Sequence, residues 1–186
     1  MKKLILGVFL LCGIVLGAQA QEKGSFWIGG NGVLSGQKTT GQESLINFKI
    51  LPEVGYQFHE DWGVAMQLGY IHEQSRATAT QRSYSNGFQV SPYVRWTYLK
   101  AGFANLFLDG GITYEYMKET KAKDATNVFA VGIRPGAAFN VSESVSLIAK
   151  VGFFGYELSK TGDFKNQWGG ADLNLENIQL GVVYNF

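Results

Sequence analysis

Strict alternation of apolar and polar residues is the feature that most constrains this chain, and residues 46–58 show it most clearly. One alternate set reads Ile46, Phe48, Ile50, Pro52, Val54, Tyr56 and Phe58. The other set reads Asn47, Lys49, Leu51, Glu53, Gly55 and Gln57. Because successive side chains of a strand point to opposite faces, the segment predicts a strand with one apolar face and one mostly polar or small face.

Seven further segments alternate in the same way, and no segment beyond residue 20 has the period of an amphipathic helix. Their apolar sets run over Phe26–Leu34, Trp62–Tyr70, Phe88–Tyr98, Leu106–Tyr116, Phe129–Phe139, Val145–Phe153 and Ile178–Phe186. Only three prolines beside 24 glycines, with 14% aromatic residues, agree with an all-β chain. Eight strands is an even number, as a closed bacterial barrel requires.

The connections between these segments alternate in length. Short turns are expected at Phe58–Trp62, Tyr98–Asn105 and Asn140–Ser144. Longer polar connections are expected at Ser35–Ser44, Gln74–Ser85, Lys118–Asn127 and Leu158–Ala171. This rhythm predicts an all-β, eight-stranded antiparallel up-and-down transmembrane β-barrel with short periplasmic turns and longer extracellular loops.

Residues 1–20 have the features of a cleaved secretory signal: Lys2 and Lys3, an apolar stretch from Leu4 to Leu16, and the small-residue site 18–20. We therefore expect a signal peptide over 1–20 and a mature barrel over 21–186. Cleavage would remove Cys12, the only cysteine, so no disulfide is expected. It would also leave 14 basic against 15 acidic residues, a balance that argues against nucleic-acid binding.

The aromatic residues of the apolar face gather at the ends of the predicted strands, with aliphatic residues between them. A girdle near the short turns is predicted from Phe26, Tyr56, Phe58, Trp62, Trp96, Tyr98, Phe139 and Tyr184. A second group near the long connections is Phe48, Tyr70, Phe88, Tyr114, Tyr116, Phe129 and Phe153. Two such belts are typical of the two interfaces of a membrane and favour lipid over water outside the barrel.

The whole predicted barrel resembles the small outer-membrane β-barrel proteins of the OmpX/OmpA-like type. The residues that carry the resemblance are the site 18–20, the segments 52–56, 92–96 and 134–136, and the last strand 182–186. The resemblance implies outer-membrane localisation and a C-terminal signal for the barrel-assembly machinery in Ile178, Leu180, Val182, Tyr184 and Phe186. Outer-membrane lipid and lipopolysaccharide are also expected as partners, because lipopolysaccharide phosphates suit the basic loop residues. The chain is expected to be monomeric.

Charged residues of both signs occupy the opposite face. The predicted lumen network is Lys49, Glu53, Arg95, Asp109, Glu115, Arg134 and Lys150, with Glu73 on the same face. An eight-stranded barrel has room inside only for its own side chains, so these charges are expected to pair into a plug. Glu53, Arg95, Asp109 and Arg134 are expected at similar depth. Pro52, Pro92 and Pro135 fall inside strands, where a bulge or bend is expected to accommodate each.

No catalytic, metal-binding or cofactor site is predicted, because no cysteine pair, histidine-rich or phosphate-cradling motif is present. The main hypothesis is a structural or interaction protein of the cell envelope that acts through its extracellular loops. A lipid-modifying enzyme using His72 is an alternative, although Glu73 beside it should point to the other face. The pattern also leaves open a narrow channel and a soluble periplasmic ligand-binding barrel.

Overall fold

The computed structural model describes residues 24–37, 45–76, 82–120, 124–173 and 178–186, so the predicted signal peptide lies outside the described residues. Every regular element in this part of the chain is a strand, as the alternation predicts. The ten strands are β1 (Phe26–Gln37), β2 (Leu45–His59), β3 (Trp62–Arg76), β4 (Arg82–Lys100), β5 (Ala104–Glu119), β6 (Ala125–Asn140), β7 (Val145–Lys150), β8 (Phe153–Thr161), β9 (Phe164–Asp172) and β10 (Gln179–Asn185).

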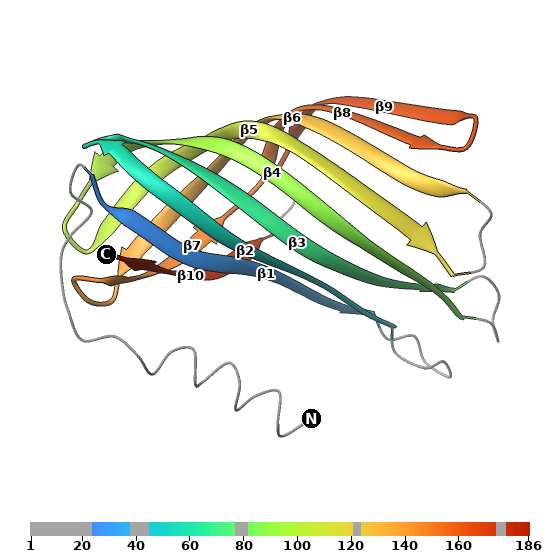
Figure 1. The fold of residues 1–186 in the computed structure, drawn as a ribbon, viewed down its shortest axis with the longest axis horizontal. Helices are drawn as coiled ribbons and strands as arrows, with labels where there is room; N and C mark the ends of the chain where they lie inside the picture. Colours follow the sequence, from blue (N-terminus) through green and yellow to red (C-terminus); the bar gives the residue numbers. More distant parts are fainter. Residues whose placement is uncertain (1–23, 38–44, 77–81, 121–123, 174–177) are drawn as a thin grey trace, which may run out of the picture.

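The strands form one closed antiparallel barrel (Figure 1). Neighbours in sequence pair from β1 to β6, and β10 closes the wall by pairing with both β1 and β7. β4 is 19 residues long and β2 and β3 are 15 each, longer than the roughly nine to eleven residues that a tilted strand needs to cross a bilayer. The predicted up-and-down transmembrane architecture is therefore confirmed.

The predicted short turns gather at one end of the barrel, together with the C-terminus (Figure 1). They contain residues 60–61, 101–103 and 141–144. At the opposite end the strands extend well into the segments predicted as long loops. The prediction of a loop over Leu158–Ala171 is wrong, because β8 and β9 form a hairpin there that turns at Gly162 and Asp163.

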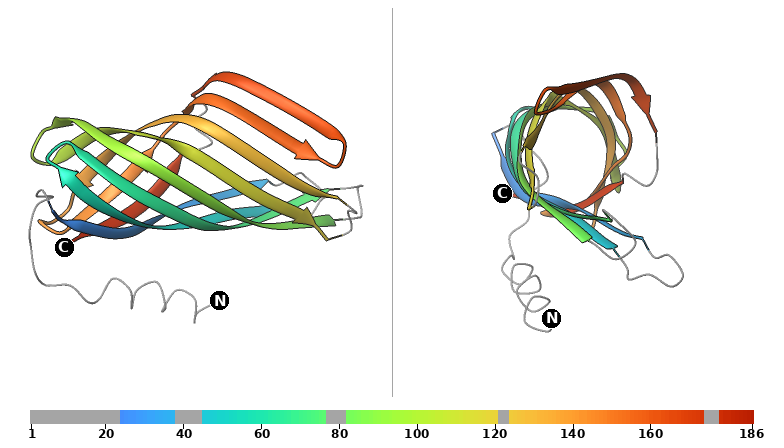
Figure 2. Two further views of the ribbon diagram at one scale, coloured as in Figure 1. Left: turned by 45° about the horizontal axis from the view of Figure 1, so that its top comes forward. Right: turned by 90° about the vertical axis from the view of Figure 1, so that its right-hand side faces the viewer.

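The last two strands of the barrel wall are each interrupted in mid-barrel, one as β7 and β8 and the other as β9 and β10, so eight strand positions contain ten elements. Lys150 pairs with Gln179, and the next pair towards the long-connection end is Phe153 with Asp172. Two residues therefore lie between these pairs on one strand and six on the other, which displaces the hairpin from the barrel wall. Figure 2 shows β8 and β9 leaning away from the ring of strands. Gly152, with φ at 74°, provides the left-handed residue at the break.

The break also reverses which side chains face the lumen. Phe153 was expected on the apolar outer face, but this is wrong: it lines an internal cavity, and its neighbour Phe154 is exposed. The outer face otherwise follows the prediction. Leu68, Val131 and Leu180 are 46–63% exposed, as lipid-facing side chains of a barrel should be.

The three prolines lie on the outer or partly exposed side, but they are accommodated differently from the expectation. At Pro52 and Pro92 the pairing with the following strand is interrupted and resumes in the same register, so neither proline lies in a bulge. The missing N–H simply removes one ladder hydrogen bond. Near Pro135 the register shifts by one residue between Ile133 and Gly136, but the additional residue lies in the opposing segment 151–153, where the partner changes from β8 to β7.

An apolar cluster fills the interior near the short-turn end. It consists of Trp27, Phe107, Ala138, Ile148 and Val183, all at most 8% exposed. The strand parity suggested a lumen that is polar throughout. This is wrong, because part of the lumen is apolar. A packed apolar floor lies below the charged network.

Candidate functional site

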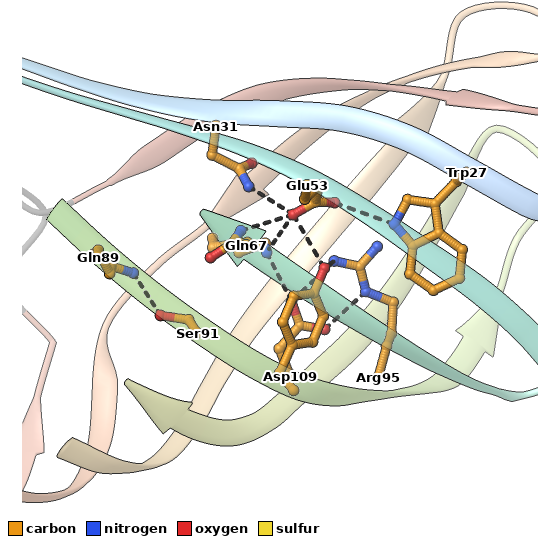
Figure 3. A network of polar contacts seen from close by, with 10 residues as sticks. Trp27, Asn31, Glu53, Gln67, Gln89, Ser91, Arg95 and Asp109 are labelled. Atoms are coloured by element: carbon orange, nitrogen blue, oxygen red, sulfur yellow. Dashed lines mark hydrogen bonds and ion pairs between the residues drawn. The ribbon is translucent and has the colours of Figure 1, made fainter. Parts of the chain in front are cut away.

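Glu53 is the centre of the polar network inside the barrel (Figure 3). Its Oε2 accepts hydrogen bonds from Gln67 Nε2 at 2.7 Å, Asn31 Nδ2 at 3.0 Å and the Tyr93 hydroxyl at 3.0 Å. Its Oε1 accepts one from Trp27 Nε1 at 3.3 Å. These donors come from β1, β3 and β4, so one carboxylate on β2 ties together side chains of four strands.

Asp109 on β5 is the second buried carboxylate of the network. Arg95 donates two hydrogen bonds to Asp109, from Nε at 2.8 Å and from Nη2 at 2.9 Å. Lys150 Nζ lies 2.9 Å from Asp109 Oδ2 and 3.4 Å from Glu53 Oε2, so it joins the two carboxylates. Two cations and two anions, each with a side chain at most 5% exposed, form a neutral buried cluster. Such pairing is what makes buried charge tolerable.

Aromatic rings surround the two cations. The guanidinium of Arg95 lies 4.0 Å from the ring centre of Phe107 and 5.5 Å from those of Trp27 and Tyr93. Lys150 Nζ lies 4.6 Å from the ring centre of Tyr93. These distances are within the range of cation–π attraction. The network is thus packed against the apolar floor.

The remaining predicted lumen residues lie nearer the long-connection end. Lys49 and Glu115 form an ion pair of their own, with side chains 22% and 17% exposed. Arg134 lies directly opposite Asp109 in the β5–β6 pair, so its backbone is at the expected depth, but its side chain forms no ion pair with the cluster. Its guanidinium instead lies 5.1 Å from the ring centre of Phe153.

A cavity of about 630 Å³ lies above the buried network, in the half of the barrel nearer the long connections. Lys49, Glu115 and Arg134 line its floor side, and Phe153, Glu157 and Trp168 of the β8–β9 hairpin line one wall. Its size is typical of small-molecule sites. Glu73, on the inward face of β3, lies across from the hairpin and also lines it.

Two participants in the network, Trp27 and Tyr93, were missed by the sequence analysis, which assigned aromatic residues to the outer face. A signal was present, since Trp27 shares its parity with Asn31, and Tyr93 shares its parity with Arg95. Both side chains are buried in the lumen, at 0% and 8% exposure. In this barrel, an aromatic residue in the alternate set that carries the polar residues therefore indicates a side chain that packs inside the lumen.

The predicted aromatic girdle lies at the short-turn end, and most of its rings touch one another. Phe26 and Tyr56 have ring centres 4.7 Å apart, and Trp62 stacks on Trp96 at 5.8 Å. The other members, Phe58, Tyr98, Phe139 and Tyr184, are partly or largely exposed at the same end. Of the residues predicted as the assembly signal, Leu180, Val182 and Phe186 are 44–64% exposed, and Ile178 and Tyr184 are half-buried.

His72 lies among aromatic side chains of the barrel's outer face. Its Nδ1 is 2.8 Å from Asn86 Oδ1, and its ring centre is 5.2 Å from that of Phe48 and 6.1 Å from that of Tyr84. In the part of the chain that the structure describes, no carboxylate or hydroxyl is bonded to it. The described residues also contain no group of three metal-ligating side chains and no helix long and apolar enough to cross a membrane.

Solved structures with the same fold are outer-membrane proteins. Neisserial surface protein A has a TM-score of 0.59 and 14% identity over 88% of this chain and 100% of its own. OprG of Pseudomonas aeruginosa has a TM-score of 0.56 and 11% identity over 91% and 99%. Ail of Yersinia pestis, solved with a heparin analogue, has a TM-score of 0.51 and 18% identity over 89% and 100%. No curated protein sequence matches significantly.

The family match is independent of these structures. The profile of the family described as "Outer membrane protein beta-barrel domain" matches residues 6–186, nearly the whole chain. A match of this extent agrees with the closed barrel, its apolar outer face and its charged interior. The chain belongs to the outer membrane protein beta-barrel domain family and is a protein of the outer membrane.

Proposed function

We propose that this protein is a structural and interaction barrel of the cell envelope, with a lumen closed to conduction and an outer surface that binds partners. The observation that carries the proposal is the neutral buried cluster of Glu53, Arg95, Asp109 and Lys150. An eight-stranded barrel has little internal width, and here that width is filled by paired charges above an apolar floor. In this proposal, the surface that extends outside the membrane binds the partners of the protein.

The β8–β9 hairpin is the described segment best suited to such contacts. Lys160 and Lys165 are exposed and directly opposite one another, and Phe164 beside them is 85% exposed. Lys160 continues the outward parity of Tyr156 and Leu158, which places it just above the apolar lipid-facing surface. Two like charges held side by side at the membrane interface suit an anionic partner, and lipopolysaccharide phosphates lie at that level.

The solved structure of Ail offers a parallel for anion binding on this fold. That protein was crystallised with sucrose octasulfate, a heparin analogue. At 18% identity the likeness concerns the fold, so the basic hairpin of this chain provides the separate support for an anionic partner.

The test is binding of lipopolysaccharide to the purified barrel and to the variant Lys160→Gln/Lys165→Gln. We expect the variant to bind less, with a smaller dependence on salt, because two phosphate-facing charges are removed. Lys100→Gln, which removes an exposed lysine at the short-turn end, is the matched control. Equal binding by the wild type and the double variant would remove the hairpin from the proposal.

Closure of the lumen has its own test in a planar bilayer. We expect the reconstituted wild-type barrel to give no single-channel current, and a steady current would show that the buried cluster does not seal the lumen. The hypothesis of a lipid-modifying enzyme is not favoured by the contacts of His72. Loss of a lipid-modifying activity in a folded His72→Ala variant would revive it.

A further inference from the structure

Arg134 differs from the other cations inside the barrel because it has no ion pair. Lys49, Arg95 and Lys150 each lie within 4.0 Å of a carboxylate, whereas no such contact or hydrogen bond joins Arg134 to any described residue. A guanidinium carries five N–H donors. A half-buried arginine that lines a cavity and has no bonded partner among the described residues is a candidate ligand-binding group.

A stack of two aromatic rings adjoins the Arg134 guanidinium. Phe153 lies beneath the guanidinium, and the rings of Phe153 and Trp168 are stacked with centres 6.1 Å apart. Glycines 132 and 155 pair directly across β6 and β8, and a β-carbon at either would collide with the Phe153 ring. The missing side chains let Phe153 lie flat against the wall. An apolar surface therefore continues from Arg134 to Trp168.

Glu157 stands at the other end of this surface and also lines the cavity. It pairs across the hairpin with Trp168 and across β6–β8 with Ala130, four residues along β6 from Arg134. Four residues of strand correspond to roughly 13 Å. Among the described residues Glu157 forms no ion pair or hydrogen bond, although its charge acts on Arg134 through space. The cavity therefore holds one positive and one negative charge that are not in contact.

We propose that this cavity binds a small zwitterion of the amino-acid or short-peptide class, with its carboxylate on Arg134, its ammonium towards Glu157 and its apolar part on Phe153 and Trp168. A guanidinium fork matches a carboxylate. The volume of about 630 Å³ is within the range of small-molecule pockets. The inference goes beyond the proposed surface interactions and does not depend on them.

The neighbouring charges favour a zwitterion over a simple anion. Glu115 is neutralised by Lys49, and Asp109 by Arg95 and Lys150. Glu73 adds negative charge to the lining, which disfavours a ligand that carries only an anionic group. A simple cation would leave the Arg134 donors unused, and only a ligand with both charges satisfies both ends.

The experiment is calorimetric titration of the full-chain protein, purified from outer membranes in detergent, with the dipeptide Gly-Phe. Its N-acetyl derivative carries only the carboxylate, and its C-terminal amide carries only the ammonium group. We expect saturable binding of Gly-Phe and binding weaker by about tenfold or more for each derivative, the scale of one charge-assisted hydrogen bond.

The variants assign each charge to its residue. Arg134→Gln should bind Gly-Phe and its amide equally, and Glu157→Gln should bind Gly-Phe and its N-acetyl derivative equally. Lys100→Gln should behave as the wild type, and a heat-dependent gel shift confirms that each variant is folded. The proposal is overturned if wild-type protein shows no saturable binding, if the derivatives bind as tightly as Gly-Phe, or if both folded cavity variants keep wild-type selectivity.

Discussion

The indole of Trp27 on β1 occupies the space in which a side chain at position 55 on β2 would lie. A β-carbon at Gly55 would be 2.1 Å from two ring atoms of Trp27, far closer than atoms can approach. We therefore predict that Gly55→Ala displaces the indole and lowers the free energy of unfolding by about 1–3 kcal/mol, the usual cost of overpacking a core. Urea unfolding of the barrel in detergent measures the change.

Gly110→Ala is the matched control for this substitution. Gly110 is also a strand glycine, but a β-carbon there would meet no atom within 4 Å. Its replacement should leave the free energy of unfolding within about 0.5 kcal/mol of the wild type. Equal effects of the two substitutions would contradict the view that Gly55 is required by Trp27.

The buried charges make a second prediction, which concerns Glu53 and Lys150. Replacing Glu53 with Gln keeps the shape of the side chain but leaves the cluster with an extra positive charge. We expect a loss of about 3–5 kcal/mol in the free energy of unfolding, as when one partner of a buried pair is removed. The urea midpoint should fall without a large change in slope.

A double-mutant cycle distinguishes charge pairing from simple loss of packing. Glu53→Gln with Lys150→Gln restores neutrality, because Arg95 and Asp109 remain paired with two hydrogen bonds. The double variant should therefore lose less free energy than the two single variants added together. Additive losses would indicate that the two charges act independently.

The short turn between β2 and β3 provides a pH-dependent prediction. A hydrogen bond from Lys100, at 2.9 Å in the ion pair, lowers the pKa of Asp61 below its ordinary value of 3.8. A carboxyl group with a lowered pKa stabilises the fold above its unfolded-state pKa, and this contribution is lost as the pH falls through the lower folded-state value. Asp61→Asn should lack this part of the acid-induced loss, which unfolding at pH 6 and below about pH 3 would reveal.

The sequence predicted the outer surface of the barrel well, for a physical reason. Lipid requires an apolar side chain at every second position, so residues such as Val54, Leu68 and Val182 reveal both the strand and the face on which they lie. The interior has no comparable rule. Trp27 and Tyr93 share the parity of inward residues, but their contact with a buried carboxylate depends on the register between strands, and alternation along a single strand carries no information about register.

The charge pairs and the break in the barrel wall could not be predicted from the sequence, for related reasons. Lys150 meets Glu53 across the lumen although 97 residues separate them, and only the closed barrel brings β7 opposite β2. Arg134 was predicted to join their cluster, yet the shift at Gly152 turns Phe153 inwards and gives Arg134 a ring instead of a carboxylate. Gly152 is one of 24 glycines, and its place in the sequence does not predict such a break.

The final strand provides the last prediction, which concerns assembly. Phe186 is 64% exposed at the end of the outward set Leu180 and Val182, so its side chain contributes little to the interior. If it belongs to a signal for the assembly machinery, Phe186→Ser should sharply reduce the amount of heat-shiftable barrel in cell membranes. The same purified variant should still fold in detergent with nearly wild-type stability, because a surface substitution typically changes the free energy of unfolding by about 0.5 kcal/mol or less.

Phe103→Ser is the control for that experiment. Phe103 is 73% exposed in the turn between β4 and β5. Its substitution therefore removes an equally accessible aromatic ring from the same end of the barrel. Its assembly in cells should be nearly normal. If both variants assemble equally well, or if Phe186→Ser fails to fold in detergent as well as in cells, the ring acts as an ordinary interfacial anchor and the terminal strand is not an address.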